Sequence, residues 1–244
     1  MAKVKVTAGM VFERHEKKYR LSEETYQKLI EKLYVYMKGD QYGKHTICSL
    51  YFDTDDYLLI RRSIGKPKYK EKMRLRSYGI PTPQSTVFLE LKKKLDGITY
   101  KRRIPMTFSD AIQYINEGKP PKESGQILEE IGWFMNKYKP LPKVLLCYER
   151  IALFGIEDNN LRVTFDSDIR WRSDRLFEMV DDGTPLISPG ERIMEIKVCG
   201  SFPCWLSGIL SELKIYPTSF SKYGTVYRNM FMKENEKENL TYAK

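Results

Sequence analysis

Seven stretches of the chain place charged residues at every second position, and in most of them the intervening residues are apolar. Arg74 and Arg76, for example, alternate with Met73 and Leu75. The stretches lie within residues 14–18, 70–76, 90–94, 99–103, 148–150, 162–166 and 194–198. Because successive side chains on a strand point to opposite faces, each stretch predicts a strand with one charged face and one apolar face.

The same pattern, read together with turn and capping residues, predicts the order of the elements. We expect strands over residues 11–21, 47–52, 69–78, 86–94, 98–105, 143–151, 161–166 and 192–198. The Asp96-Gly97 dipeptide predicts a hairpin between two of these strands. Apolar residues at helical spacing predict helices over residues 22–39, 109–118, 123–139 and 203–214, with Ser22 and Ser109 as N-caps. We expect one domain over residues 1–232 and a frayed or disordered tail over 233–244.

Many antiparallel strands with helices between them predict an α+β fold. A closed barrel satisfies the alternation if the apolar faces point outward under the helices and the charged faces point inward. Such an interior is stable only if it is wet or holds a ligand of opposite charge, because burying unpaired like charges is costly. The alternative is that the charged faces form the solvated side of an open sheet. Over seven strands this alternative weakens, since it leaves one exposed face almost purely basic.

Composition limits the partners and the chemistry. Forty-two Lys and Arg residues against 32 Asp and Glu give a net charge of +10, which favours nucleic acid, an anionic membrane surface or a phosphorylated small molecule. No run of about 18 apolar residues predicts a membrane span. Residues 1–7 lack the apolar core of a signal peptide, and the four cysteines are scattered, so we expect reduced thiols and a cytoplasmic location. With two histidines, neither a zinc site nor a histidine-centred triad is expected.

The charged faces suit a phosphate chain. Guanidinium groups bind phosphate oxygens at two points, and ammonium groups act as mobile point charges. The carboxylates fit a divalent cation, Mg²⁺ or Mn²⁺, that bridges phosphate oxygens. On the strand over 98–105, the alternation allows either Lys101 and Arg103 or Arg102 alone to face inward.

Eight short motifs, in order, resemble a known family. They are Arg14-x-Glu16-x-Lys18-Tyr19, residues 49–54 (SLYFDT), Arg74-x-Arg76, residues 90–92 (ELK), Tyr148-x-Arg150, residues 161–166 (LRVTFD), residues 194–197 (MEIK) and residues 219–223 (SFSKY). Over residues 10–224 the chain resembles the VTC domain, the polyphosphate polymerase branch of the triphosphate tunnel metalloenzymes, also called CYTH proteins. The resemblance implies an eight-stranded antiparallel β-barrel tunnel with a charged interior and helices packed outside.

The resemblance also implies roles for individual residues. The basic residues that contact triphosphate or polyphosphate in the family match Lys18, Arg74, Arg76, Lys92, Arg150, Arg162 and Lys222. The late-strand metal ligand matches Glu195, and Tyr148 and Ser221 match positions that bond to phosphate oxygens. Many tunnel triphosphatases begin with Glu-x-Glu-x-Lys, whereas Arg14 stands here in place of the first Glu. Losing that carboxylate disfavours a two-metal hydrolase and favours the polymerase branch.

The leading hypothesis is therefore an enzyme that moves the γ-phosphoryl group of ATP onto a growing inorganic polyphosphate chain with the help of Mn²⁺ or Mg²⁺. No general base is required, because a terminal phosphate is largely ionised near pH 7. We expect catalytic roles for Arg74, Arg76, Arg150, Arg162 and Lys18. We expect substrate contacts from Lys92, Lys197, Tyr148, Ser221, Lys222, Arg14 and Lys72, and metal contacts from Glu195, Glu90 and Glu16. Glu16 and Glu90 are alternatively salt-bridge partners of the arginines, and Tyr148 is alternatively a packing residue.

Three other functions stay open. A tripolyphosphatase or nucleoside triphosphatase would use the same tunnel with water as the acceptor. A non-catalytic polyphosphate sensor would need no metal, and Glu195 argues against it because a carboxylate weakens a pure anion binder. A nucleic-acid partner is not expected, since the basic residues alternate with apolar residues and not with stacking aromatics. The expected partners are ATP and polyphosphate, with a separate membrane subunit as a further expectation.

Overall fold

The structure is a computed structural model that describes residues 14–65, 67–96, 98–121 and 125–241, with backbone only for Arg14 and residues 232–241. Its central element is one antiparallel sheet, and the predicted α+β class is confirmed. Eight strands follow one another across the sheet in the order β1 (Arg14–Leu21), β10 (Arg192–Cys199), β8 (Arg162–Arg172), β7 (Leu141–Gly155), β3 (His45–Asp53), β4 (Tyr69–Tyr78), β5 (Thr86–Leu95) and β6 (Ile98–Thr107). Two short strands lie off this path: β2 (Met37–Gly39) pairs with β7, and β9 (Thr184–Pro185) pairs with β8.

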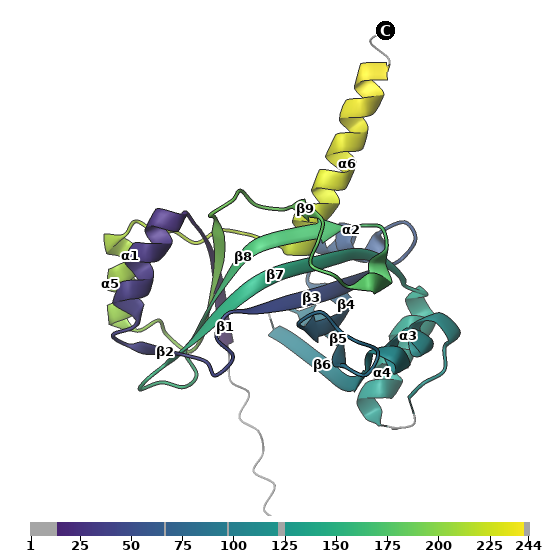
Figure 1. Cartoon of the computed structure of the whole chain (residues 1–244), viewed down its shortest axis with the longest axis horizontal. Helices are drawn as coiled ribbons and strands as arrows, with labels where there is room; N and C mark the ends of the chain where they lie inside the picture. The colour runs from purple at the N-terminus through teal and green to yellow at the C-terminus, as the bar shows by residue number, and fades with distance from the viewer. Residues whose placement is uncertain (1–13, 66, 97, 122–124, 242–244) are drawn as a thin grey trace, which may run out of the picture.

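The sheet is strongly curved but does not close into a barrel (Figure 1). In the part of the chain that the structure describes, β1 and β6 form its two edges and do not pair with each other. The predicted closed eight-stranded barrel is therefore corrected to a curved, open, ten-stranded sheet. Both edge strands are rich in Lys and Arg, a composition that discourages strand pairing at a sheet edge.

Strand faces follow the predicted alternation. Met73 and Leu75 of β4 and Leu89 and Leu91 of β5 are almost fully buried on the convex side of the sheet. The charged residues between them lie on the concave side. The apolar faces therefore point outward under helices, and the arrangement of polar and apolar layers is inverted relative to an ordinary barrel.

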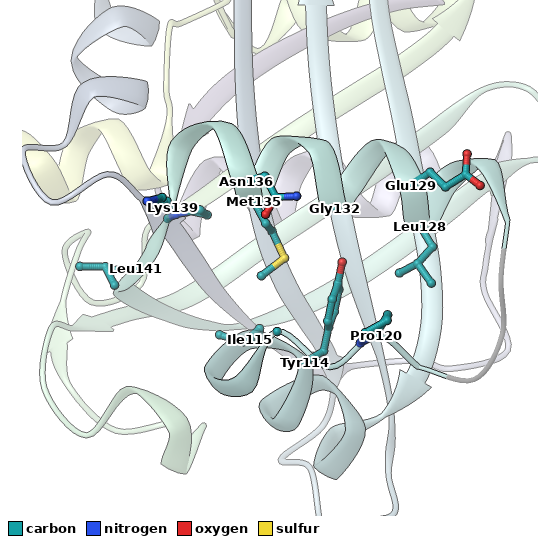
Figure 2. A pocket seen from close by; sticks show the side chains of 12 residues that line it. Tyr114, Ile115, Pro120, Leu128, Glu129, Gly132, Met135, Asn136, Lys139 and Leu141 are labelled. Atoms are coloured by element: carbon teal, nitrogen blue, oxygen red, sulfur yellow. The ribbon is translucent and has the colours of Figure 1, made fainter.

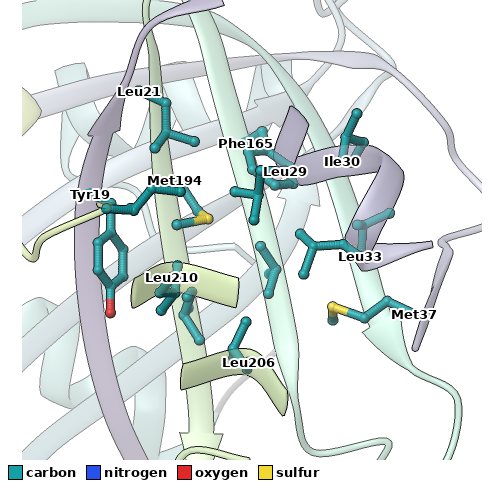
Figure 3. Close-up of a cluster of buried hydrophobic side chains, with 14 of the residues drawn as sticks. Tyr19, Leu21, Leu29, Ile30, Leu33, Met37, Phe165, Met194, Leu206 and Leu210 are labelled. Atoms are coloured by element: carbon teal, nitrogen blue, oxygen red, sulfur yellow. The ribbon is translucent and has the colours of Figure 1, made fainter. Parts of the chain in front are cut away.

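Helices α1 (Glu23–Leu33) and α5 (Cys204–Glu212) cover the convex face of β1, β10 and β8 (Figure 3). Leu29 and Leu33 of α1 pack with Leu206 of α5 in this core. The predicted N-cap is confirmed, because the Thr25 backbone N–H donates to Ser22 Oγ at 3.2 Å. The helix was expected to continue to residue 39, but residues 37–39 form β2 instead. An apolar residue at position 37 fits either element, and pairing with β7 buries it.

Helices α3 (Phe108–Glu117) and α4 (Gln126–Tyr138) cover the convex face of β4 and β5. Thr107, and not Ser109 as predicted, caps α3, since the Asp110 backbone N–H donates to Thr107 Oγ1 at 3.1 Å. Tyr114 from α3 points toward α4, and the two helices line a pocket of about 560 Å³ (Figure 2). This pocket lies outside the curve of the sheet and contains none of the predicted site residues.

Two helices that the sequence did not predict lie against the concave side. The buried Asp53 carboxylate accepts hydrogen bonds from the Leu59 and Ile60 backbone N–H groups at 2.8 and 2.9 Å, which ties α2 (Leu58–Ile64) to β3. It also accepts from the Tyr223 hydroxyl at 3.0 Å, which ties down the start of α6 (Lys222–Thr241).

Helix α6 then projects away from the sheet (Figure 1). Its backbone is helical as far as residue 241, and residues 242–244 lie outside the described residues. A frayed or disordered tail over residues 233–244 stays a prediction. A short 3₁₀ helix, η1 (Leu176–Glu178), precedes β9. None of the described helices is both long and apolar enough to cross a membrane.

Candidate functional site

The concave face of the sheet surrounds a cavity of about 180 Å³. Seven strands and the first turn of α6 contribute to it, and nine cationic side chains face three carboxylates. It is lined by Glu16, Lys18, Tyr51, Lys72, Arg74, Arg76, Glu90, Lys92, Lys101, Tyr148, Arg150, Glu195, Lys197, Ser221, Lys222 and Tyr223.

Thirteen of the fifteen predicted site residues are among these lining residues. The two others are not among them. Arg162, at the start of β8, lines a neighbouring cavity. The side chain of Arg14 lies outside the described part of the chain, although its backbone begins β1. The preference for a polymerase that Arg14 indicates therefore stays a prediction from the sequence.

Glu90 fixes the direction of Arg74. Arg74 Nε donates to Glu90 Oε2 at 2.7 Å, and Lys101 Nζ lies 2.7 Å from the other oxygen. Burial would raise the pKa of Glu90, but the neighbouring charges of Arg74 and Arg76 outweigh it and lower that pKa to about 2. Glu90 is therefore an ionised, almost fully buried anchor already engaged by cations.

Two tyrosines hold the guanidinium groups of β4. Arg74 Nη1 donates to the Tyr51 hydroxyl at 3.1 Å, and Arg76 Nη2 donates to the Tyr148 hydroxyl at 3.1 Å. Burial would raise the pKa of Tyr51, yet Arg74 and Arg76 outweigh it and lower the pKa to about 7. Tyr148 thus contacts a site arginine and is also packed in the core formed with α6.

Asp166 fixes the direction of Arg150, as Glu90 fixes that of Arg74. Arg150 donates from Nε and Nη2 to the two carboxylate oxygens at 2.6 and 2.8 Å, and Lys222 at the start of α6 pairs with the same carboxylate. Burial opposes ionisation, but Lys222 and Arg150 outweigh it and lower the pKa of Asp166 to about 2. Two cations from distant parts of the chain are therefore positioned by one buried anion.

Glu195 and Glu16 approach one point from adjacent strands. Lys18 Nζ lies 3.5 Å from Glu195 Oε2 and 3.6 Å from Glu16 Oε1, and Lys197 pairs with Glu195. Burial would raise the pKa of Glu195, but Lys197 and Lys18 hold it well below its usual range. The two oxygens suit a hard divalent cation, which commonly binds one or two carboxylates together with phosphate oxygens. Among the described residues, no three His, Cys, Asp or Glu side chains gather as a metal-binding group, so phosphate and water would complete such a shell.

Lys72 and Lys92 show that strands without mutual hydrogen bonds face each other across the cavity. Burial lowers the pKa of Lys72 on β4 to about 8. Tyr51 opposes this in part, whereas the charge of Lys18 on β1 adds to it. Burial also lowers the pKa of Lys92 on β5, while Glu16 on β1 acts to raise it. The charged faces of β5 and β1 therefore meet across the interior, as the alternation predicted, although the sheet is open.

Two further cavities lie on either side of the central one along the strand direction. One, of about 580 Å³, shares Lys72 and Ser221 with the central cavity and also includes Lys68, Lys94 and Arg228. The other, of about 980 Å³, lies at the opposite end of β4. Along β4, Lys70, Arg74 and Tyr78 line the first, the central and the last cavity in turn. We call this row of three cavities the channel, and each of them has cations in its wall.

The contacts of β6 show which of its two faces points into the cavity. Lys101 and Arg103 both approach Glu90, whereas Arg102 Nε donates to Glu130 of α4 at 2.9 Å on the outer side. Of the two alternatives that the alternation allowed, Lys101 and Arg103 inward is therefore the one observed.

Asp166, Tyr51 and Tyr223 were not predicted as site residues, and Lys101 was predicted only as one of two alternatives for β6. Asp166 and Tyr51 lie inside motifs, and the alternation put Asp166 on a charged face, so the signal for both was present. Tyr223 also lies inside a motif, but its place in the site depends on the contact between α6 and Asp53.

Fold and cavity together define an antiparallel sheet curved around a basic, tunnel-like channel. The model of the VTC domain matches residues 13–231, and the chain belongs to this family. The resemblance drawn from the eight motifs is thus confirmed. No curated protein matches the chain.

Among solved structures, the first of the following three shows the same fold at low identity, and the other two are less similar. A candidate adenylate cyclase from Bacillus halodurans is 16% identical, with a TM-score of 0.52 over 84% of this chain and 92% of that chain. A candidate adenylate cyclase from Vibrio parahaemolyticus is 10% identical, with a TM-score of 0.48 over 88% and 98% of the two chains. The PH1819 protein from Pyrococcus horikoshii OT3 is 12% identical, with a TM-score of 0.48 over 88% and 99%.

Proposed function

We propose that this VTC domain transfers the γ-phosphoryl group of ATP onto the end of an inorganic polyphosphate chain. The observation that carries the proposal is the continuation of the basic channel beyond the central cavity, along Lys68, Lys94 and Arg228. A triphosphate alone needs only the central cavity, whereas a long polyanion gains from every further cation along its path.

The central side chains would act mainly by alignment and charge neutralisation, which is what phosphoryl transfer requires. Arg74, Arg76 and Arg150 are each held by a buried carboxylate or a tyrosine, so their donors are fixed before substrate binds. Such preorganised donors stabilise the charge that develops in the transition state. Lys18, Lys72, Lys92, Lys197, Ser221 and Lys222 would bind the remaining phosphate oxygens.

The reaction needs no side chain to act as a base. A terminal phosphate oxygen of the acceptor forms a bond to the γ-phosphorus while the bond from that phosphorus to the β,γ-bridging oxygen breaks. ADP leaves with the electron pair, and the chain is longer by one phosphate. The acceptor oxygen is largely ionised near neutral pH, since the second pKa of a phosphate monoester is about 6.

Glu195 and Glu16 are the residues that would hold a divalent cation, because both carboxylates reach the same point beside Lys18. Such a cation, Mn²⁺ or Mg²⁺, would supply charge neutralisation of phosphate oxygens. Glu90 fits this role less well, since it is almost fully buried and each of its oxygens lies 2.7 Å from a cation, whereas Glu195 Oε2 lies 3.5 Å from Lys18. We propose Glu90 as a positioning residue for Arg74.

The carboxylate pair of Glu16 and Glu195 also supports a second candidate, a triphosphatase in which water replaces the phosphate acceptor. The two functions share every contact to the donor triphosphate and differ only in the acceptor. A single domain over residues 1–232, a cytoplasmic location and a separate membrane subunit are parts of the proposal that rest on sequence alone.

Phosphorus NMR of the purified protein with ATP and Mn²⁺ tests the proposal. A growing resonance of internal polyphosphate phosphates, lost in Glu195→Gln and in Arg74→Ala, supports the polymerase. Orthophosphate without chain growth would support the triphosphatase. Tight polyphosphate binding without turnover would support a sensor and overturn both enzymes. Arg102→Ala, which removes a cation from the outer face of β6, is the matched control and should leave the product unchanged.

A further inference from the structure

The cavity at the far end of β4 differs in chemistry from the rest of the channel. It has a volume of about 980 Å³, within the range of small-molecule sites. Its wall comes from β2 and the loop before β3, the start of β3, the end of β4, the start of β5, β6, and the junction of β7 and β8. Aromatic rings are its most frequent side chains, against one lysine, Lys38; the rings are Tyr42, His45, Tyr78, Phe88 and Phe154.

These rings are arranged as a connected but open cluster. The Tyr78 ring meets the edge of Phe88 with centroids 5.7 Å apart and lies 6.2 Å from the ring of His45. Tyr42 continues the cluster, 6.1 Å from His45. Tyr42 is 68% exposed and Tyr78 49% exposed, so both keep ring surface available for a flat partner.

Two arginines stand beside these rings. The Arg103 guanidinium lies 3.3 Å from the centroid of Phe88, and Arg103 Nε lies 3.7 Å from Glu90 in the central cavity. Arg103 therefore links the aromatic cavity to the phosphate-binding centre. Arg162 lies 5.0 Å from the Phe154 centroid, and its Nε is buried without a hydrogen-bond partner among the described residues. A buried donor of this kind is uncommon unless a ligand or ordered water completes it.

The opposite end of the channel provides the contrast. Among the residues that the structure describes, none with an aromatic side chain lines the cavity that includes Lys68, Lys94 and Arg228. It suits an anionic chain and offers nothing for a base to stack on. The channel therefore has a direction: an aromatic end with two arginines, a centre with fixed guanidinium groups, and an end rich in lysine.

We propose that the aromatic cavity binds the nucleoside part of a nucleoside triphosphate, with its base stacked on Tyr78 and Tyr42 and with Arg162 and Arg103 donating to the ribose and α-phosphate. This inference rests on the proposed function, because it takes the triphosphate to occupy the central cavity. The donor then enters from the aromatic end and places its γ-phosphate among Arg74, Arg76 and Arg150. The polyphosphate acceptor approaches from the lysine end, opposite the leaving ADP, as in-line displacement requires.

Equilibrium binding of two probes tests the inference: the β,γ-imido analogue of ATP, and inorganic tripolyphosphate. Both carry three linked phosphate groups, but only the analogue has a base and a ribose. The variants are Tyr78→Ala, Tyr42→Ala and Arg162→Gln, with Tyr216→Ala, an exposed tyrosine that lines none of the three channel cavities, as the control. Tyr42 is mostly exposed, so its variant keeps the test valid if Tyr78→Ala fails to fold.

We expect Tyr78→Ala and Tyr42→Ala each to weaken the ATP analogue about tenfold, within the effect of removing one base-stacking aromatic, and to leave tripolyphosphate within about twofold. Arg162→Gln should weaken the analogue more than tripolyphosphate. Equal losses for both probes, or no loss for either, would overturn the nucleoside site while leaving the phosphate channel intact. If the parent protein binds neither probe, the proposed function fails first, so the two failures are distinguishable.

Discussion

Arg150 and Asp166 face each other on neighbouring strands β7 and β8, and two hydrogen bonds of 2.6 and 2.8 Å lock the guanidinium to the carboxylate. Lys222 of α6 pairs with the same carboxylate from the other end of the chain. This one buried anion therefore sets the positions of two cations that line the cavity.

Asp166→Asn should lower turnover more than it lowers folding stability. The neutral amide cannot hold both cations, so Arg150 loses its fixed direction and Lys222 its partner. We expect kcat to fall by about tenfold or more, as for a misplaced transition-state donor, and the free energy of unfolding to fall by about 1–3 kcal/mol. Steady-state kinetics and urea unfolding measure the two effects.

Asp168→Asn is the matched control, because Asp168 lies two residues further along β8 and pairs with Arg170 on the exposed surface. It should leave both quantities unchanged. Full turnover in Asp166→Asn would contradict the positioning role of this carboxylate.

The Arg74–Glu90 pair gives a second prediction, for which an outer-face carboxylate is the control. Glu90→Gln removes the charge that anchors Arg74, Lys101 and Arg103, whereas Glu130→Gln removes a carboxylate that holds Lys93 and Arg102 outside the channel. We expect Glu90→Gln to lower kcat by at least about tenfold and the unfolding free energy by about 1–3 kcal/mol. Glu130→Gln should affect stability slightly and turnover not at all.

The stability difference at Glu90 should also depend on pH in a defined direction. The folded-state pKa of about 2 lies below the ordinary value of 4.5, so the ionised carboxylate stabilises the fold above pH 4.5. That contribution is lost as pH falls from 4.5 toward 2. Parent and Glu90→Gln should therefore differ most in urea unfolding near neutral pH and converge in acid. A difference that stays constant between pH 6 and pH 3 would show that charge is not its source.

The sequence predicted most of the strands and the charged face of each strand, because a period of two is a local property. Tyr69–Tyr78 was expected with the bounds observed for β4, and Arg192 was correctly expected to begin β10. Closure of the sheet was predicted wrongly, since pairing between β1 and β6 depends on the global curvature and not on either strand alone.

The cavity was likewise predictable only where alternation placed a residue on a charged face. Helices α2 and α6 were not predicted, because tertiary contacts to Asp53 hold them at the concave side. Arg162 was assigned to the phosphate-binding group, whereas the structure places it with the aromatic rings at one end. The stagger between neighbouring strands decides which cavity of the channel a residue lines. The pattern of residues along the sequence does not reveal that stagger.

Tripolyphosphate affinity should fall as pH rises from 7 to 9. Burial lowers the pKa of Lys72 to about 8, so this lysine loses its positive charge over that range in the free protein. Tyr51, with a pKa of about 7, gains a negative charge over the same range, and both changes oppose anion binding.

Two variants separate these groups. Lys72→Arg keeps its charge, so the ratio of its affinity to that of the parent should increase through pH 8, and Tyr51→Phe should behave similarly around pH 7. Ionisation of the ligand is common to all the proteins and cancels in these ratios. Titration calorimetry between pH 6 and pH 9 measures them, and a flat ratio for both variants would be inconsistent with the assigned pKa values.

Lys101 and Arg102 provide the most direct test of which face of β6 lines the channel. They are adjacent cations with similar side-chain exposure, 45% and 40%, but Lys101 approaches Glu90 inside and Arg102 binds Glu130 outside. Lys101→Ala should weaken tripolyphosphate binding by about three- to tenfold and reduce its salt dependence, because one cation near the anion is lost. Arg102→Ala removes the same formal charge from the chain and should change neither quantity. Equal effects of the two variants would mean that the net charge of the domain, and not the inner wall of the channel, attracts the anion.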